Sequence, residues 1–211
     1  RFAERADQAD VPELFRGAVL GRLDEVHCAA LARTLRIEPE RERFVLLSAR
    51  ERLEAENADG DAELAHVLEV VFAAREHCVL PLGDGTYATV CRADEAETEE
   101  DLQQLAEALV ETEKEEYNAD IFVSVSTVKK SLLQLSDALN EAREAMDAGR
   151  ALANGRVFLY RRLLPERLLM RVNCTALHDF AQETRCLNWE KQLGVEMRET
   201  IDAFFESSLN L

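Results

Sequence analysis

The sequence lacks the signals that would direct a chain into or across a membrane. No stretch approaches the roughly eighteen consecutive apolar residues that a membrane-spanning helix needs. The first ten residues are polar and mixed in charge, without the apolar core of a signal peptide. We therefore expect a cytoplasmic protein. The chain begins at Arg1 rather than at a methionine and ends inside an apolar pattern, so we also expect a fragment of a longer protein.

The cysteines are scattered, and no two of them have a metal-binding spacing. The five cysteines contain no C-x-x-C pair, so the sequence indicates neither a zinc site nor a disulfide framework. If Asp84-Gly85 is a two-residue hairpin turn, the residue numbers of each cross-strand pair add up to 169, and Cys78 faces Cys91. We expect two reduced, partly buried thiols there. A redox bridge between them is the alternative, which a reducing cytosol disfavours.

Local catalytic motifs are also missing. The sequence contains no G-x-S-x-G, no phosphate-binding P-loop and no G-x-G-x-x-G that opens a helix. Its four histidines show no H-x-x-x-H spacing. These absences favour a binding or regulatory module over an enzyme. We predict no catalytic residue, no cofactor and no metal site.

Basic residues are few compared with acidic ones. The chain has 42 acidic and 25 basic residues, which gives a formal net charge of −17 at pH 7. A surface this negative repels phosphate backbones, so the chain should not bind nucleic acid by itself. The acids cluster at residues 94–101 and 111–116, on either side of a predicted helix. We interpret both clusters as solvated faces rather than metal sites.

The region from Tyr117 to Tyr160 contains a strand–helix–strand pattern. Residues 121–125 and 157–160 are short apolar runs of β-forming residues, and a helical pattern separates them. A connection of this length can cross over a sheet. Alanines beside the apolar seam of the helix should let it lie close to the sheet. The seam consists of Val128, Leu132, Leu135, Leu139, Ala142 and Met146.

A second strong signal is a β-hairpin. Residues 78–82 and 86–91 are β-prone runs on either side of a Gly-Asp-Gly turn. Asp-Gly favours a type I′ turn because glycine tolerates a positive φ, and Pro81, which lacks an N–H, places its strand at an edge or a start. The turn residues Asp84 and Gly85 could bind a cation or a phosphate, although turn chemistry alone also explains them.

The remaining patterns complete an alternating order. Residues 11–35 predict two helices with a bend at Gly21-Asp24, and the apolar run at 43–48 fits a strand buried on both faces. Helical spacing begins at Asp61, and Thr98 resembles a helix cap. The order is strand, helix, strand, strand, helix, strand, helix, strand. Such an order is typical of an α+β fold in which helices pack on a mixed sheet.

After Tyr160 the sequence predicts mostly helix. Pro165 can open a short helix, and residues 172–182 predict another. Residues 197–209 are amphipathic, and their apolar face needs a partner surface. Trp189 lies in an irregular stretch between them, and we interpret it as a core anchor at a domain junction.

These features resemble a known family. The element order, with Gly83-Asp84-Gly85 on the hairpin, resembles a GGDEF-type nucleotide cyclase domain, which has a ferredoxin-related fold, and residues 138–150 look like its last crossover helix. The chain is more similar still to the degenerate GGDEF-like domain of bacterial CdaR/PucR regulators of sugar-diacid and purine catabolism. Residues 13–37 and 163–169 resemble the helices that flank the domain there. Residues 199–211 are similar to the helix that opens that family's C-terminal helix-turn-helix domain.

The resemblance implies three segments and a regulatory role. Residues 1–37 would be a helical segment, residues 38–161 a degenerate GGDEF-like domain, and residues 162–211 a helical segment leading into a missing helix-turn-helix domain. The whole protein would be a DNA-binding transcriptional regulator, and this chain its non-catalytic signalling or dimerisation region. A homodimer would bind promoter DNA through downstream residues, not through this acidic chain, under an unknown small-molecule effector.

The hairpin departs from that of an active cyclase. An active domain carries Gly-Gly-Asp/Glu-Glu-Phe on the hairpin and a metal-binding Asp near the end of its first strand, whereas this chain has Gly83–Tyr87 and Leu46–Ala49 there. Two divalent ions need several carboxylates, which Asp84 alone does not provide, so we do not expect cyclase activity. The alternative function is a degenerate nucleotide- or cyclic-dinucleotide-binding domain that uses the surface near Asp84 and Gly85.

Overall fold

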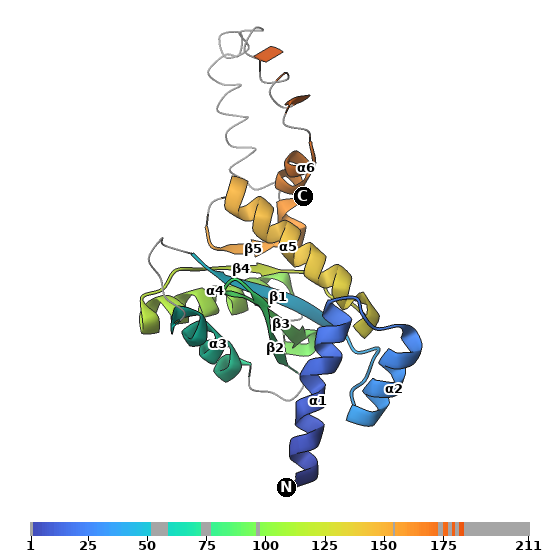
Figure 1. Ribbon diagram of the computed structural model, residues 1–211. Coiled ribbons are helices and arrows are strands. Elements are labelled where there is room, and N and C mark those ends of the chain that lie inside the picture. The colour runs from blue at the N-terminus through green and yellow to red at the C-terminus, as the bar shows by residue number, and fades with distance from the viewer. Residues whose placement is uncertain are drawn as a thin grey trace. The chain divides into compact units, whose positions relative to one another are not determined.

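The computed structural model describes residues 2–51, 59–72, 77–95, 98–153 and 155–172, with a few single positions up to residue 183 (Figure 1). The chain divides into two compact units, residues 1–167 and 168–211, and the fold described here is that of the first. The described helices and strands are α1 (Phe2–Val19), α2 (Glu25–Leu35), β1 (Arg43–Arg50), α3 (Asp59–Val71), β2 (Cys78–Gly83), β3 (Thr86–Arg92), α4 (Glu99–Tyr117), β4 (Ile121–Val125), α5 (Leu135–Leu152), β5 (Val157–Leu159) and α6 (Leu164–Arg171).

The described strands form one mixed sheet in the order β2-β3-β1-β4-β5 (Figure 1). Neighbouring strands are antiparallel except β4 and β5, which are parallel. A parallel pair needs a crossover connection, and α5 provides it. The predicted order of strands and helices and the α+β class are therefore confirmed.

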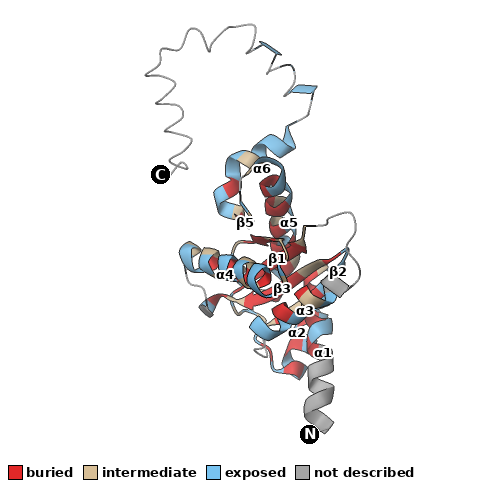
Figure 2. Cartoon of the chain, turned by 90° about the vertical axis from the view of Figure 1, so that its left-hand side faces the viewer, coloured by how far each residue is buried: buried red, intermediate tan, exposed pale blue. Residues whose placement is uncertain are grey.

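Helices cover both faces of this sheet. On one face, α3 and α4 pack against Phe44 and Leu46 of β1; on the other, α1, α2 and α5 pack against Val45 and Leu47. β1 is buried along its whole length except at Arg50, which confirms a strand covered on both sides. Figure 2 shows the buried residues along the sheet and on the sides of the helices that face it.

Local signals fix the helix ends. The Asp24 carboxylate caps α2 by accepting a hydrogen bond from the backbone N–H of His27 at 2.8 Å, and the residue after the helix, Arg36, closes its end with a left-handed φ of 58°. The bend between α1 and α2 therefore lies where the sequence predicts it. Thr98 and Asp101 form a capping box at the start of α4, as predicted.

The crossover helix begins at Leu135, so the prediction that Val128 and Leu132 belong to its seam is wrong; Leu132 is buried in a short 3-10 helix before it. Long-range bonds hold the preceding residues in an extended form. Lys129 and Arg43 exchange backbone hydrogen bonds of 2.7 and 2.8 Å, and Glu141 accepts hydrogen bonds from the backbone N–H and the hydroxyl of Thr127. The spacing of apolar residues along the sequence, on which the prediction rests, carries no information about hydrogen bonds between distant residues.

The β2–β3 hairpin has the predicted turn. Asp84 and Gly85 have φ angles of 53° and 67°, as a type I′ turn requires. β2 is an edge strand, as Pro81 indicates. The register, however, differs from a simple two-residue hairpin, because the pairing shifts between Pro81 and Gly83. This irregularity puts Cys78 opposite Val90.

The predicted pairing of Cys78 with Cys91 is therefore wrong. Side chains alternate between the faces of a sheet, so a shift of one residue moves a side chain to the other face. Cys78 packs in the core on the α5 side, whereas Cys91 packs beneath α3 and α4. Both are buried thiols. Their placement on different faces excludes a bridge between them.

Several predictions concern residues outside those described. Trp189, the amphipathic helix at 197–209 and the segment 199–211 lie there, as does much of the predicted helix at 172–182. The division of the chain after residues 37 and 161 stays a prediction. In the part of the chain that the structure describes, every helix is too short or too polar to cross a bilayer.

Candidate functional site

A hollow of about 320 Å³ lies between the β2–β3 hairpin and α5. Three elements form its walls. β1 contributes the apolar side chains of Leu47 and Ala49. The other lining residues are Leu82, Gly83, Asp84 and Thr86 from the hairpin, and Arg143, Met146, Asp147 and Arg150 from α5.

The structure places Asp84, the acid singled out in the sequence, on the wall of this hollow. Gly85 is not one of the lining residues. Its φ of 67° lets the turn close, which a residue with a side chain does less readily. Of the two predicted residues, therefore, Asp84 lines the hollow and Gly85 shapes the turn that carries it.

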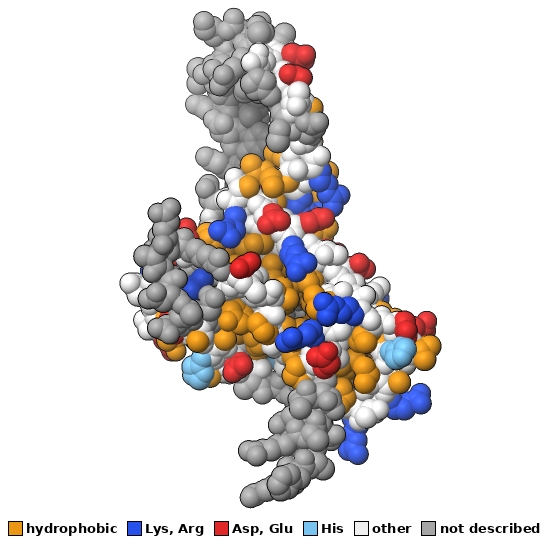
Figure 3. Space-filling model, viewed as in Figure 1, with side chains coloured by type: hydrophobic (Ala, Val, Ile, Leu, Met, Phe, Trp, Pro, Cys, Tyr) orange, Lys and Arg blue, Asp and Glu red, His pale blue; other side chains and the backbone are white. Residues whose placement is uncertain are grey.

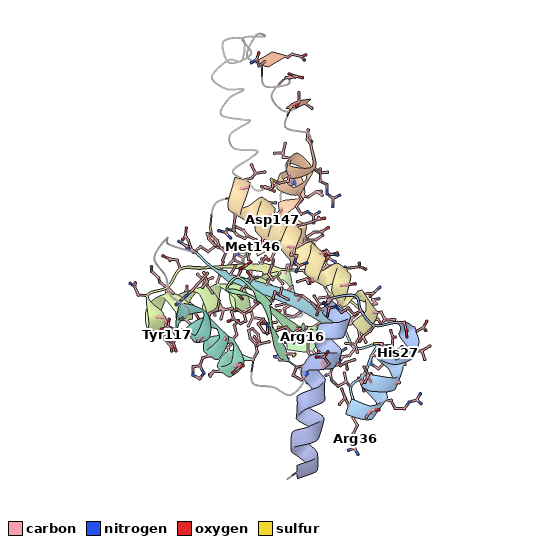
Figure 4. All side chains as sticks on the ribbon, in the orientation of Figure 1. Arg16, His27, Arg36, Tyr117, Met146 and Asp147 are labelled. Atoms are coloured by element: carbon pink, nitrogen blue, oxygen red, sulfur yellow. The ribbon has the colours of Figure 1, made fainter. Side chains whose placement is uncertain are left out.

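Sequence reasoning misses the charged residues of α5 that share this hollow, namely Arg143, Asp147 and Arg150. They are spaced four and three residues apart, as the buried residues of the helix are, and each follows a buried residue by one position. They therefore lie together on one side of the helix. Met146 and Asp147 are neighbours on α5 (Figure 4). The guanidinium carbon of Arg150 lies 4.6 Å from the ring centre of Phe122, and this contact limits where the side chain can point.

The hollow combines two acids with two arginines. α5 carries two arginines, Arg143 and Arg150, and no lysine. Figure 3 shows basic and acidic side chains interspersed on this face of a chain whose net charge is −17. Guanidinium groups bind carboxylate and phosphate oxygens in a bidentate manner. Arg143 and Arg150 could therefore bind an anionic group beside Asp84.

The described residues that line this hollow do not provide the carboxylates of a two-metal site. The β1 wall presents Leu47 and Ala49, and the two lining acids, Asp84 and Asp147, come from separate elements. Within the described residues, no group of three His, Cys, Asp or Glu side chains could hold a metal ion. Divalent ions that hold a triphosphate need several such ligands.

The sequence matches the GGDEF-like domain family over residues 20–148, well over half of the chain. No curated protein matches it.

The similar solved structures include two from bacteria. The crystal structure of a regulator of polyketide synthase expression from Bifidobacterium adolescentis aligns with a TM-score of 0.50 and 18% identity, over 78% of this chain and 60% of that one. The active GGEEF domain of a diguanylate cyclase from Vibrio cholerae aligns with a TM-score of 0.45 and 16% identity, over 74% of this chain and 96% of that one. At 18% identity, the likeness to the regulator shows a shared fold, and this chain spans 60% of that protein's length.

Proposed function

Because the chain belongs to the family of GGDEF-like domains, we propose that it is the non-catalytic central region of a DNA-binding transcriptional regulator of the CdaR/PucR type. In this role the domain relays a signal or holds two protomers together. It does not itself read DNA. The working protein is cytoplasmic, and it binds its promoter as a homodimer.

The observation that carries this proposal is the composition of the hairpin hollow. A cyclase of this fold needs carboxylates from the first strand and from the hairpin, and the β1 wall here consists of Leu47 and Ala49. Two arginines and two acids cannot position two divalent ions around a triphosphate. A domain that keeps the fold without these ligands fits regulation better than catalysis.

Two further observations support a transcriptional role. The fold is shared with a protein named as a regulator of polyketide synthase expression. Residues 199–211 resemble the first helix of a helix-turn-helix domain. Because the charge of −17 disfavours contacts to DNA phosphates, we assign those contacts to residues downstream of Leu211. Two-fold symmetric operators match a homodimer.

The proposal is tested with the full gene product, including any residues that follow Leu211. We expect a gel shift with a DNA fragment from the gene's own upstream region and a two-protomer mass by light scattering. The chain that ends at Leu211 is the matched control, and it should not shift the same fragment. Failure of the full protein to shift any fragment of an upstream-region library would contradict the proposal.

A second candidate function is nucleotide or cyclic-dinucleotide binding at the hairpin hollow. The observation in its favour is that Arg143 and Arg150 line the same hollow as Asp84. Isothermal titration calorimetry with GTP and cyclic dinucleotides, on the parent chain and on the Arg143→Ala, Arg150→Ala and Asp84→Ala variants, separates the outcomes. Heat that disappears in both arginine variants would support this function, and no heat with the parent chain would dismiss it.

A further inference from the structure

A second, larger hollow of about 600 Å³ lies at the end of the sheet away from the hairpin turn. β3, β4 and β5 run in the same direction and end beside it, at Arg92, Val125 and Leu159. Pockets of about 300–1,000 Å³ are typical of small-molecule sites. The size of this hollow therefore suits a small ligand.

Part of the lining is apolar and buried. Ala93, Leu102, Val125 and Leu159 line the hollow with side chains that are at most 8% exposed. Tyr160 adds a partly buried aromatic ring. A ligand would cover this surface with an apolar body, because apolar area removed from water stabilises a complex.

Two of the three lining acids are already occupied by arginines. Asp94 accepts hydrogen bonds from Arg92 at 2.6 and 3.0 Å and from Arg41 at 2.7 Å. The hydrogen bonds from Arg92, helped by Arg41, hold the pKa of Asp94 well below its usual range. Glu99 lies 3.5 Å from Arg161. These carboxylates are poor sites for a cationic ligand, because their oxygens already accept hydrogen bonds from arginines.

Three of the lining hydroxyl groups, those of Thr98, Ser126 and Thr127, are engaged as well. Ser126 accepts a hydrogen bond from the backbone N–H of Val45 and donates one to the carbonyl of Thr127. The hydroxyl of Thr127 donates to Glu141 at 2.6 Å, and Thr98 accepts the N–H that caps α4. The acceptors in the hollow are thus largely in use.

Lys130, in contrast, has an available charge. It lines the hollow and is exposed, and within the described residues no hydrogen bond or ion pair engages its ammonium group. The preceding residue, Lys129, is instead fixed by Glu141 at 2.6 Å. An ammonium group has three donors and no acceptor, so it favours a ligand with anionic oxygen.

We infer that this hollow binds a small organic carboxylate, whose apolar body covers Leu102 and Val125 and whose carboxylate pairs with Lys130. The third lining acid, Glu42, is exposed and would repel such a ligand. The inference concerns binding by this chain alone, and it does not depend on the transcriptional role.

The test is a calorimetric titration of the whole chain with a panel of carboxylates: benzoate, phenylacetate, 2-naphthoate and the fatty acids from butanoate to decanoate. Each is paired with its amide and with the amine of the same carbon skeleton. We expect at least one carboxylate to bind, more tightly than its amide and its amine. Binding of none, or an amide or amine that binds as tightly as the best carboxylate, would overturn the inference.

Matched variants localise the binding. Lys130→Gln should lower the affinity for the best carboxylate about three- to tenfold, because it removes one charge-assisted contact at an exposed site. Glu42→Gln should raise that affinity, because it removes a repelling charge. Lys114→Gln makes the same charge change outside the lining and should have no effect. An unchanged affinity in Lys130→Gln would overturn the inference.

A second pair of variants tests occupancy of the hollow. Val128→Trp places a large side chain on an exposed position of its lining, and we expect it to reduce binding at least tenfold. Val26→Trp, on α2 and outside the lining, makes the same change at an exposed position and should bind like the parent. Equal affinities of the two variants would place the ligand elsewhere and contradict the inference.

Discussion

Gly149 of α5 packs directly against the ring of Phe158 in β5, and a Cβ atom at Gly149 would overlap that ring. This contact brings the backbone of the crossover helix against the sheet. It explains why small residues recur along the buried side of α5, as the sequence predicts: Ala138, Ala142, Ala145 and Ala148 are all buried there. The position of α5 also places Arg143 and Arg150 at the hairpin hollow.

Gly149→Ala should therefore destabilise the fold. Alanine favours an exposed helix over glycine by about 1 kcal/mol, but overpacking against Phe158 should cost about 1–3 kcal/mol and reverse the sign. Urea unfolding measures the difference. The reference is the pair Arg143→Ala and Arg143→Gly at an exposed position of the same helix, where alanine should be the more stable. If Gly149→Ala were instead stabilising, by as much as alanine exceeds glycine at position 143, Gly149 would not lie against the Phe158 ring.

Glu113 of α4 should lower stability at neutral and alkaline pH. Its side chain is fully buried, neither carboxylate oxygen has a hydrogen-bond partner, and the guanidinium of Arg50 is 3.9 Å away. Burial raises the pKa of Glu113 above its ordinary value. Its contribution to stability is therefore present below the unfolded-state pKa and is lost as the pH rises through the folded-state pKa.

Glu113→Gln removes that dependence. We expect the free energy of unfolding of the variant to exceed that of the parent by about 1 kcal/mol near pH 8. This difference should narrow toward about pH 4, where Glu113 is protonated. Arg50 keeps an ion pair with Glu63 at 3.0 Å, so the substitution does not strand its charge. Glu111→Gln, on an exposed position of α4, is the control and should change little. A gap that widens as the pH falls would contradict the assignment.

Cys78 should react slowly with alkylating reagents. Burial raises the pKa of the Cys78 thiol to about 12, so little thiolate exists near neutral pH. Peptide-level mass spectrometry after iodoacetamide treatment should show slow labelling of Cys78 in the folded chain and rapid labelling in urea. After mild oxidation, the same peptides should contain no Cys78–Cys91 link, because the two side chains lie on different faces of the sheet. Detection of that link in the folded chain would contradict the observed register.

Gly85 should be needed for the hairpin turn. Its φ of 67° lies in the left-handed region, where a Cβ atom is disfavoured, so Gly85→Ala should destabilise the fold by about 1 kcal/mol. Asp84→Asn, at a φ of 53°, should be almost neutral, because asparagine tolerates this region. Thermal unfolding of the two variants checks the difference. Equal stability of Gly85→Ala and the parent would argue against a type I′ turn.

Much of the fold follows from the sequence, because its signals are local. The Asp84-Gly85 turn, the capping box at Thr98 and the apolar run of β1 each act within a few residues. What the sequence does not reveal depends on contacts between distant residues. The shifted register of β2 and the extended backbone at Val128 are two examples, since the second is fixed by the pairing of Arg43 with Lys129.

The candidate sites show the same limit. Asp84 can be found from the sequence because a glycine-flanked acid on a turn is a local pattern. The arginines of α5 cannot be assigned to the same hollow without knowing how the helix is rotated over the sheet. The larger hollow joins residues from the ends of β3, β4 and β5 with the start of α4, and only the sheet order brings these together.

The central claim is that this domain serves a DNA-binding regulator and does not read DNA itself. Fluorescence anisotropy of a labelled fragment from the gene's own upstream region, titrated with the full gene product and with the chain that ends at Leu211, tests it most directly. The account predicts saturable, salt-sensitive binding by the full product and none by the shorter chain. Equal anisotropy curves for the two proteins, whether both bind or neither does, would contradict it.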